Sequence, residues 1–194
     1  MKPKSKLFVD LDGVIVDWLG GSLELCGVNS HNPVIRNLLR DGTKIDDLIA
    51  GGRQTLTDAV NDAGPDFWLN LRFLPWGKEL IARLKTEFAA THRLAFLTSP
   101  GKFPLAAQGK VAWLLNNYPD DSIIICRDKE LCASEDAFLI DDADYQIKPF
   151  IRDGGCGFLW PNQYTLMDVD DRDLGHSRQV INQCVSAIKL VHDS

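Results

Sequence analysis

The stretch Phe8-Val9-Asp10-Leu11-Asp12-Gly13-Val14 indicates both the fold and the kind of site to expect in this chain. Its apolar start is typical of a strand buried on both faces, and the strand ends in two carboxylates one residue apart. Gly13 then permits a sharp turn. Because neighbouring carboxylates repel each other, a divalent cation is the simplest reason for the pair, and hard Mg²⁺ prefers oxygen ligands. The spacing excludes an EF-hand calcium loop, which needs three alternating acids before its glycine.

Further apolar runs predict more strands of the same kind. They end abruptly in polar residues, at Leu94–Leu97 before Thr98, Ile123–Ile125 before Cys126 and Phe138–Ile140 before Asp141. Segments with helical spacing alternate with them or follow them, at Leu80–Phe88, Val111–Tyr118 and Ile181–Ile188. This alternation predicts an α/β fold with a parallel sheet flanked by helices. Ligands of such sheets bind at the carboxyl ends of the strands, where the polar residues should converge: Asp10, Asp12, Thr98, Ser99, Asp141 and Asp142.

Residues 16–72 interrupt the alternation of strands and helices. The segment is long and rich in Gly, Asn and Arg, with helix-like pieces at Trp18–Cys26 and Val34–Leu39. We predict a small, mostly helical cap inserted after the first strand, with residues 1–15 and 73–194 forming the core.

Composition and charge restrict the class of protein. The length of 194 residues suits one domain with a modest insertion, and a hydrophobic content of 45% is ordinary for a globular chain. The formal net charge of -6 argues against binding to nucleic-acid polymers or anionic membranes. The N-terminus lacks the apolar core of a signal peptide, which predicts a cytoplasmic protein. No heptad or apolar stripe requires self-association, although a homodimer remains one of the expected states.

Two groups of residues outside these motifs are expected to have no special role. The five cysteines form no CxxC pair, which favours reduced, mostly buried thiols over a disulfide framework or a zinc site. The acidic stretch Asp168–Asp173 is predicted to be a surface loop rather than a second metal site.

The ordered motifs resemble those of the haloacid dehalogenase superfamily of phosphotransferases. The first motif is Asp10–Val14, the second is Thr98, the third is assigned to Lys110 and the fourth is Asp141-Asp142. Within this superfamily the chain is most similar to the 5'(3')-deoxyribonucleotidase group, and the quoted segments are Leu97-Thr98-Ser99-Pro100, Arg127-Asp128-Lys129, Ile140-Asp141-Asp142 and Phe67-Trp68-Leu69. Ala143 departs from the pattern, because relatives often carry an arginine there.

The resemblance implies a Mg²⁺-dependent phosphatase acting on nucleoside monophosphates, preferably deoxyribonucleotides. Asp10 would attack phosphorus, and Asp12 would act first as general acid and then as general base. Thr98, Ser99 and Lys110 would bind the phosphate. Mg²⁺ would be held by Asp10, the Asp12 carbonyl, Asp142 and Asp141, the last directly or through water.

The substrate follows from weaker features. Phe67 and Trp68 are expected either to stack on a base or to pack in the core, and Trp18 is another candidate for the pocket wall. Arg127 would contact the substrate or support the phosphate loop, with a capping role around Asp128 as the alternative. The alternatives for the whole chain are a phosphatase for another small phosphate ester and a non-catalytic binding protein of the same fold. The sequence does not indicate which base, which sugar or which phosphate position the enzyme prefers.

Overall fold

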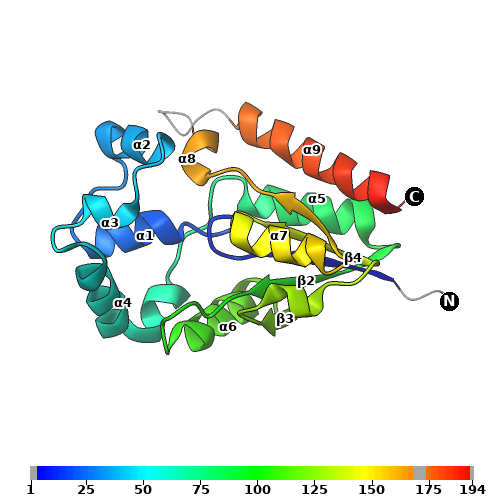
Figure 1. The fold of residues 1–194 in the computed structure, drawn as a ribbon, viewed down its shortest axis with the longest axis horizontal. Helices are drawn as coiled ribbons and strands as arrows, with labels where there is room; N and C mark the ends of the chain where they lie inside the picture. The colour runs from blue at the N-terminus through cyan, green and yellow to red at the C-terminus, as the bar shows by residue number, and fades with distance from the viewer. Residues whose placement is uncertain (1–3, 168–173, 193–194) are drawn as a thin grey trace.

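The computed structural model describes residues 4–167 and 174–192, and the acidic stretch Asp168–Asp173 lies outside them. In the described residues one five-stranded sheet has the order β3-β2-β1-β4-β5, and all its neighbouring strands are parallel (Figure 1). The strands are β1 (Ser5–Val9), β2 (His92–Thr98), β3 (Ser122–Ile125), β4 (Ala137–Asp141) and β5 (Cys156–Leu159). The predicted α/β fold with a parallel sheet is confirmed.

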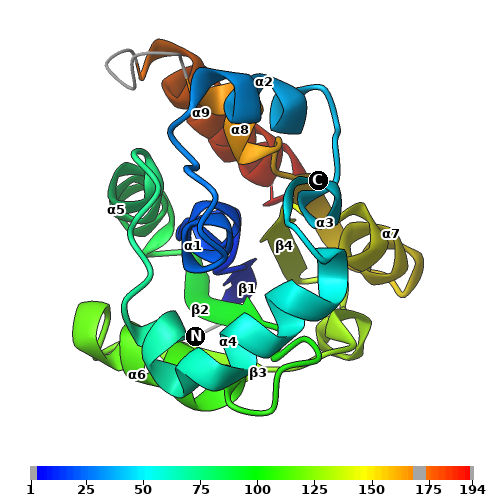
Figure 2. The same ribbon diagram turned by 90° about the vertical axis from the view of Figure 1, so that its left-hand side faces the viewer.

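Helices cover both faces of the sheet, as Figure 2 shows from one end. One face packs against α5 (Gly77–Phe88), α6 (Ala106–Asn117) and α9 (Gly175–His192), and the other against α7 (Asp144–Arg152) and the 3-10 turn η1 (Lys129–Cys132). Alternate residues of β1 pack on opposite faces of the sheet. Leu7 and Val9 belong to one apolar cluster, and Phe8 belongs to the other. This explains why the strands read as continuous apolar runs.

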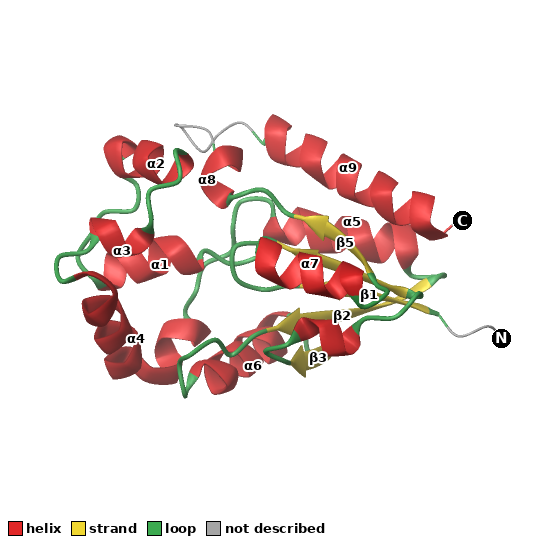
Figure 3. Cartoon of the chain, in the orientation of Figure 1, coloured by secondary structure: helices red, strands yellow, loops and turns green. Residues whose placement is uncertain are grey.

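A group of helices lies beyond the carboxyl ends of the strands, toward which the strand arrows point in Figure 3. It contains α1 (Trp18–Leu25), α2 (Pro33–Arg40), α3 (Ile45–Leu48), α4 (Gly52–Leu69) and, from the C-terminal part, α8 (Gln163–Leu166). The two predicted helical pieces are confirmed as α1 and α2. Asp17 caps α1 by accepting a hydrogen bond from the Gly20 amide at 2.7 Å. The division into core and cap stays a prediction.

The structure contains elements that the sequence pattern did not indicate. Helix α4 was not predicted because Gly64 and Pro65 interrupt its pattern, and Gly64 has φ 62° and ψ -151° at a kink. Strand β5 has only four residues, which include Gly157, and α7 contains Pro149. These residues weaken the local signal, so packing against the sheet decides the structure.

Two observations bear on the expectations from composition. All five cysteines are free thiols, as predicted, but the expectation that most are buried is wrong, because only Cys184 is buried. Within the described residues no helix has the length and hydrophobicity needed to cross a bilayer.

Candidate active site

The three central strands bring the predicted polar residues to one edge of the sheet. Asp10 follows β1, Thr98 ends β2 and Asp141 ends β4, and β1 lies between the other two strands. Val9 is paired with both Phe96 and Ile140, and the Asp10 amide donates to the Ile140 carbonyl oxygen at 2.9 Å. The parallel register therefore places Asp10 beside Asp141.

Gly13 allows the turn after β1 to pass close to Asp142. Its φ is 74°, in the left-handed region, and its amide donates to the Val16 carbonyl oxygen at 3.0 Å. A Cβ atom at this position would overlap the Asp142 carboxylate. Glycine is therefore required both by the backbone conformation and by the close approach of Asp142.

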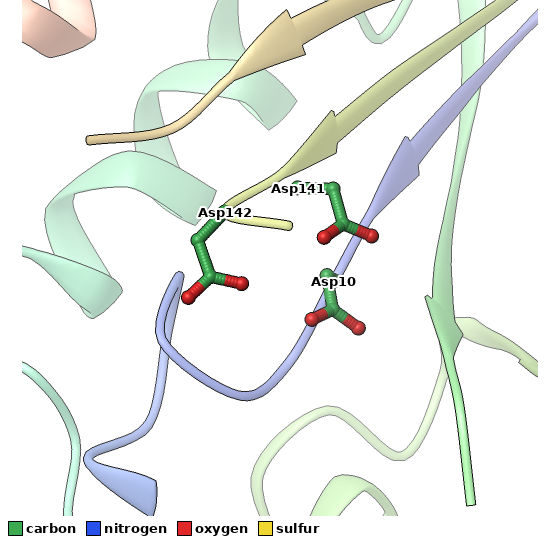
Figure 4. A group of neighbouring side chains, drawn as sticks. All are labelled: Asp10, Asp141 and Asp142. Atoms are coloured by element: carbon green, nitrogen blue, oxygen red, sulfur yellow. The ribbon is translucent and has the colours of Figure 1, made fainter. Parts of the chain in front are cut away.

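Three carboxylates form a cluster at this edge. One oxygen each of Asp10, Asp141 and Asp142 lies within 4.8 Å of the others, and Figure 4 shows the three side chains together. Burial, reinforced by the Asp10 charge, raises the pKa of Asp141 to about 6. The same two causes, joined by the charges of Asp141 and Asp12, raise the pKa of Asp142 well above its usual value. The negative charge of the cluster is therefore not fully balanced by neighbouring positive groups. Its carboxylate oxygens are ligands that a hard divalent cation prefers.

Lys129 supplies part of that positive charge, and sequence reasoning did not include it among the site residues. Its ammonium group lies 2.7 Å from Asp10 Oδ1 and 2.5 Å from Asp141 Oδ2. Burial opposes the charge of Lys129, but the two carboxylates outweigh burial and raise its pKa. The only signal in the sequence is its place in the segment Arg127-Asp128-Lys129, from which only Arg127 was predicted to be a site residue.

Lys110 contacts Asp12, which follows β1, and the end of β2. Its Nζ lies 2.6 Å from Asp12 Oδ2, and it donates to Ser99 O at 2.5 Å and to Thr98 Oγ1 at 3.3 Å. Burial raises the pKa of Asp12, and the Lys110 charge opposes this shift. Asp12 Oδ1 has no hydrogen-bond partner among the residues described. Asp12 therefore combines a partly neutralised carboxylate with a free oxygen.

These groups line a cavity of about 440 Å³ that has a polar and an aromatic part. The polar part contains both lysines, the aspartates, Thr98 and Ser99. The aromatic part contains Trp18, Trp68, Phe103 and Tyr145. The cavity therefore offers charged groups for a small anion and aromatic side chains for a planar group.

Two predicted site residues lie outside this cavity lining. Phe67 packs edge-on against Trp68 with ring centroids 5.0 Å apart, and it lines a separate hollow of about 320 Å³. Arg127 is exposed and donates to the Gly101 carbonyl oxygen at 2.7 Å. Since Gly101 follows Ser99-Pro100, Arg127 contacts the loop after β2.

The comparisons with known proteins identify one family and several solved structures that are similar to this chain. The family model described as "5' nucleotidase, deoxy (Pyrimidine), cytosolic type C protein" matches residues 4–168. No curated protein matches the chain significantly. A hydrolase from Streptococcus pneumoniae TIGR4 is 14% identical, with a TM-score of 0.49, over 87% of this chain and 100% of that one. A HAD family hydrolase from Deinococcus radiodurans R1, solved with bound phosphate and sodium, is 12% identical over 96% and 98%, with a TM-score of 0.46.

Proposed function

Because the chain belongs to the 5'-nucleotidase family of the haloacid dehalogenase superfamily, and is therefore a phosphatase, we propose that it hydrolyses nucleoside monophosphates, preferably deoxyribonucleotides. The observation that carries the proposal is one cavity lined both by carboxylates and lysines and by aromatic side chains. The lysines suit a phosphate by charge, and the aromatic side chains suit a base by stacking.

Asp10 is the proposed nucleophile. One of its carboxylate oxygens forms a bond to phosphorus, the bond from phosphorus to the ester oxygen breaks, and an aspartyl-phosphate results. Lys129 contacts Asp10 Oδ1, and this contact holds the carboxylate in one orientation. Water then attacks the same phosphorus and releases phosphate, which regenerates Asp10.

Asp12 is the proposed carrier of the proton. Its raised pKa helps it to hold a proton for the leaving sugar oxygen, and its unpartnered Oδ1 is the atom from which we propose that this proton leaves. In the second half of the reaction the same carboxylate accepts a proton from the attacking water. Asp12 is then protonated again for the next cycle.

Three polar groups are proposed to hold the transferred phosphoryl group. Lys110 neutralises charge on its oxygens, and the Thr98 hydroxyl and the Ser99 backbone amide donate hydrogen bonds. Lys110 also contacts Asp12, Thr98 and Ser99 in the structure, which keeps these groups together before a substrate arrives.

A Mg²⁺ ion fits the carboxylate cluster. The residues proposed to hold it are Asp10, the Asp12 carbonyl, Asp141 and Asp142, because the three clustered carboxylates repel one another and one lysine contacts only two of them. When bound, the ion would lower the negative charge around the phosphoryl group.

Aromatic side chains of the cavity are proposed to bind the base. Trp18, Phe103 and Tyr145 line the cavity, and 75% of the Tyr145 surface is exposed. A stacked aromatic side chain accepts any base, so these residues favour nucleotides over sugar phosphates without fixing the base. The word "cytosolic" in the family description supports the cytoplasmic location expected from the sequence.

Phosphate release from a panel of esters tests the proposal. The panel contains nucleoside 5'- and 3'-monophosphates with both sugars, ribose 5-phosphate and p-nitrophenyl phosphate, each with Mg²⁺ and with an Asp10→Asn control. We expect selective hydrolysis of deoxyribonucleotides and no turnover by Asp10→Asn. Hydrolysis of sugar phosphates alone would overturn the substrate and keep the chemistry, whereas activity of Asp10→Asn near wild type would remove Asp10 as nucleophile.

A further inference from the structure

Trp68 is too enclosed to serve as a stacking surface for a base. Only 3% of its surface is exposed, although it lines the cavity. Three other rings surround it: Trp18 at 6.4 Å and 20°, Phe103 at 5.7 Å and 56°, and Phe67 at 5.0 Å and 75°. Stacking on a ligand requires an open ring face, so the ring of Trp68 calls for a different explanation.

The ring of Trp68 meets a buried cation. Lys110 Nζ lies 4.8 Å from the ring centroid, and the Lys110 side chain is 3% exposed. The three N–H groups of the ammonium have oxygen partners on Asp12, Ser99 and Thr98, so the aromatic ring is a fourth neighbour. The attraction between a cation and an indole face is stronger when both groups are little exposed to water, and both side chains are only 3% exposed.

The backbone fixes Trp68 relative to Lys110. A Cβ atom on Gly109 would overlap the Pro65 carbonyl oxygen and Trp68 Cβ, so α4 and α6 touch at the residue before Lys110. The kink at Gly64 separates this last part of α4 from the rest of the helix. The last turn of α4, which contains Trp68, therefore packs directly against α6, which contains Lys110.

We propose that Trp68 is a positioning residue for phosphoryl transfer, whose ring holds the Lys110 ammonium against Asp12 and the Thr98-Ser99 segment. The inference rests on the proposed function of this site. It goes beyond that function because it gives Trp68 a role in the rate of the reaction rather than in recognition of the base. Its effect should be the same for every phosphate ester that the enzyme accepts.

Two substitutions at Trp68 distinguish the effect of its aromatic face from the effect of filling space. Trp68→Leu removes the π face, whereas Trp68→Phe keeps one. We expect Trp68→Leu to lower kcat by about tenfold with a nucleoside 5'-monophosphate and equally with ribose 5-phosphate or p-nitrophenyl phosphate, with little change in KM. Trp68→Phe should retain most of kcat. A rise in KM confined to the nucleotide would show base stacking and overturn the proposal, as would equal losses in the two variants.

A double-mutant cycle tests whether Trp68 acts through Lys110. In a Lys110→Met background, Trp68→Leu should cause no further loss of kcat, because the cation it positions is gone. The same fold-loss in both backgrounds would contradict the proposal.

A crystal structure of Trp68→Leu adds a readout that needs no activity. We expect the Lys110 ammonium to leave Asp12, and an unchanged position would reject the proposed role. Absence of turnover by the wild-type enzyme on every ester would overturn the proposed function, and this structural test of Trp68 would still be decisive.

Discussion

At the scale of single residues, Lys129 decides how much negative charge the site can hold. It is buried and lies between Asp10 and Asp141, whose carboxylates would otherwise face each other in a low dielectric. Removing one partner of a buried ion pair leaves an uncompensated charge, which costs far more than losing a surface pair.

Lys129→Gln should therefore affect both stability and turnover. We expect a loss of roughly 3 to 5 kcal/mol in the free energy of unfolding and a fall in kcat of at least about 100-fold. Urea unfolding without metal and steady-state kinetics measure the two effects. Lys148→Gln is the matched control, because its pair with Asp144 is exposed and should change neither quantity. Wild-type stability and activity in Lys129→Gln would contradict this account of the charge balance.

At the scale of elements, the contact between α4 and α6 depends on Gly109. Alanine is favoured over glycine in a helix by about 1 kcal/mol, but its methyl group would overlap the Pro65 carbonyl oxygen and Trp68. Overpacking costs about 1 to 3 kcal/mol, so the cost of this overlap should exceed the gain in helix propensity. We expect Gly109→Ala to lower the free energy of unfolding and kcat together, and Gln108→Ala, at an exposed neighbouring position, to change little. An increase in stability of Gly109→Ala would refute the close approach.

The contact between β2 and the end of α9 should make stability depend on pH. Burial, together with the charge of His192, lowers the pKa of His92, and the two rings lie 5.0 Å apart. Below about pH 6.5 the unfolded chain therefore binds more protons at His92 than the folded chain does. Stability supplied by this residue is present at higher pH and is lost as the pH falls through that range.

Urea unfolding at neutral pH and at a pH below 6 measures this loss. We expect the wild type to lose more stability on acidification than His92→Gln does. The exposed His176→Gln serves as control and should behave like the wild type. Equal losses in wild type and His92→Gln would exclude His92 as a source of the pH dependence.

Elements with an uninterrupted local pattern were predictable from the sequence, and interrupted ones were not. The runs before Asp10, Thr98 and Asp141 indicated parallel strands, and parallel strands bring their carboxyl ends together, so the clustering of these residues followed. Lys129 lies in a 3-10 turn that has no periodicity, and its site is defined only by tertiary contacts. Helix α4 was hidden by Gly64-Pro65, whose kink is stabilised by packing rather than by propensity.

At the scale of the whole molecule, the fold concentrates negative charge where the two strands β1 and β4 end. The chain has a net charge of -6, and Asp10, Asp141 and Asp142 gather at one edge of the sheet. The raised pKa values of Asp141 and Asp142 show that ionising this cluster works against folding without a counter-ion. A cation that binds the folded chain should therefore stabilise the whole domain.

Mg²⁺ should raise the melting temperature of the chelator-treated protein and restore its activity. An ion that binds only the folded state adds RT ln(1 + [L]/Kd) to the free energy of unfolding, about 2.7 kcal/mol at 100 times Kd. Thermal unfolding with and without Mg²⁺, at ionic strength matched with NaCl, separates binding from screening of charge. Asp142→Asn removes one charge from the cluster, so its melting temperature should be higher than that of the wild type without metal and should respond less to Mg²⁺. An identical Mg²⁺ response in the two proteins would place the ion elsewhere, and full activity after thorough chelation would remove it from the mechanism.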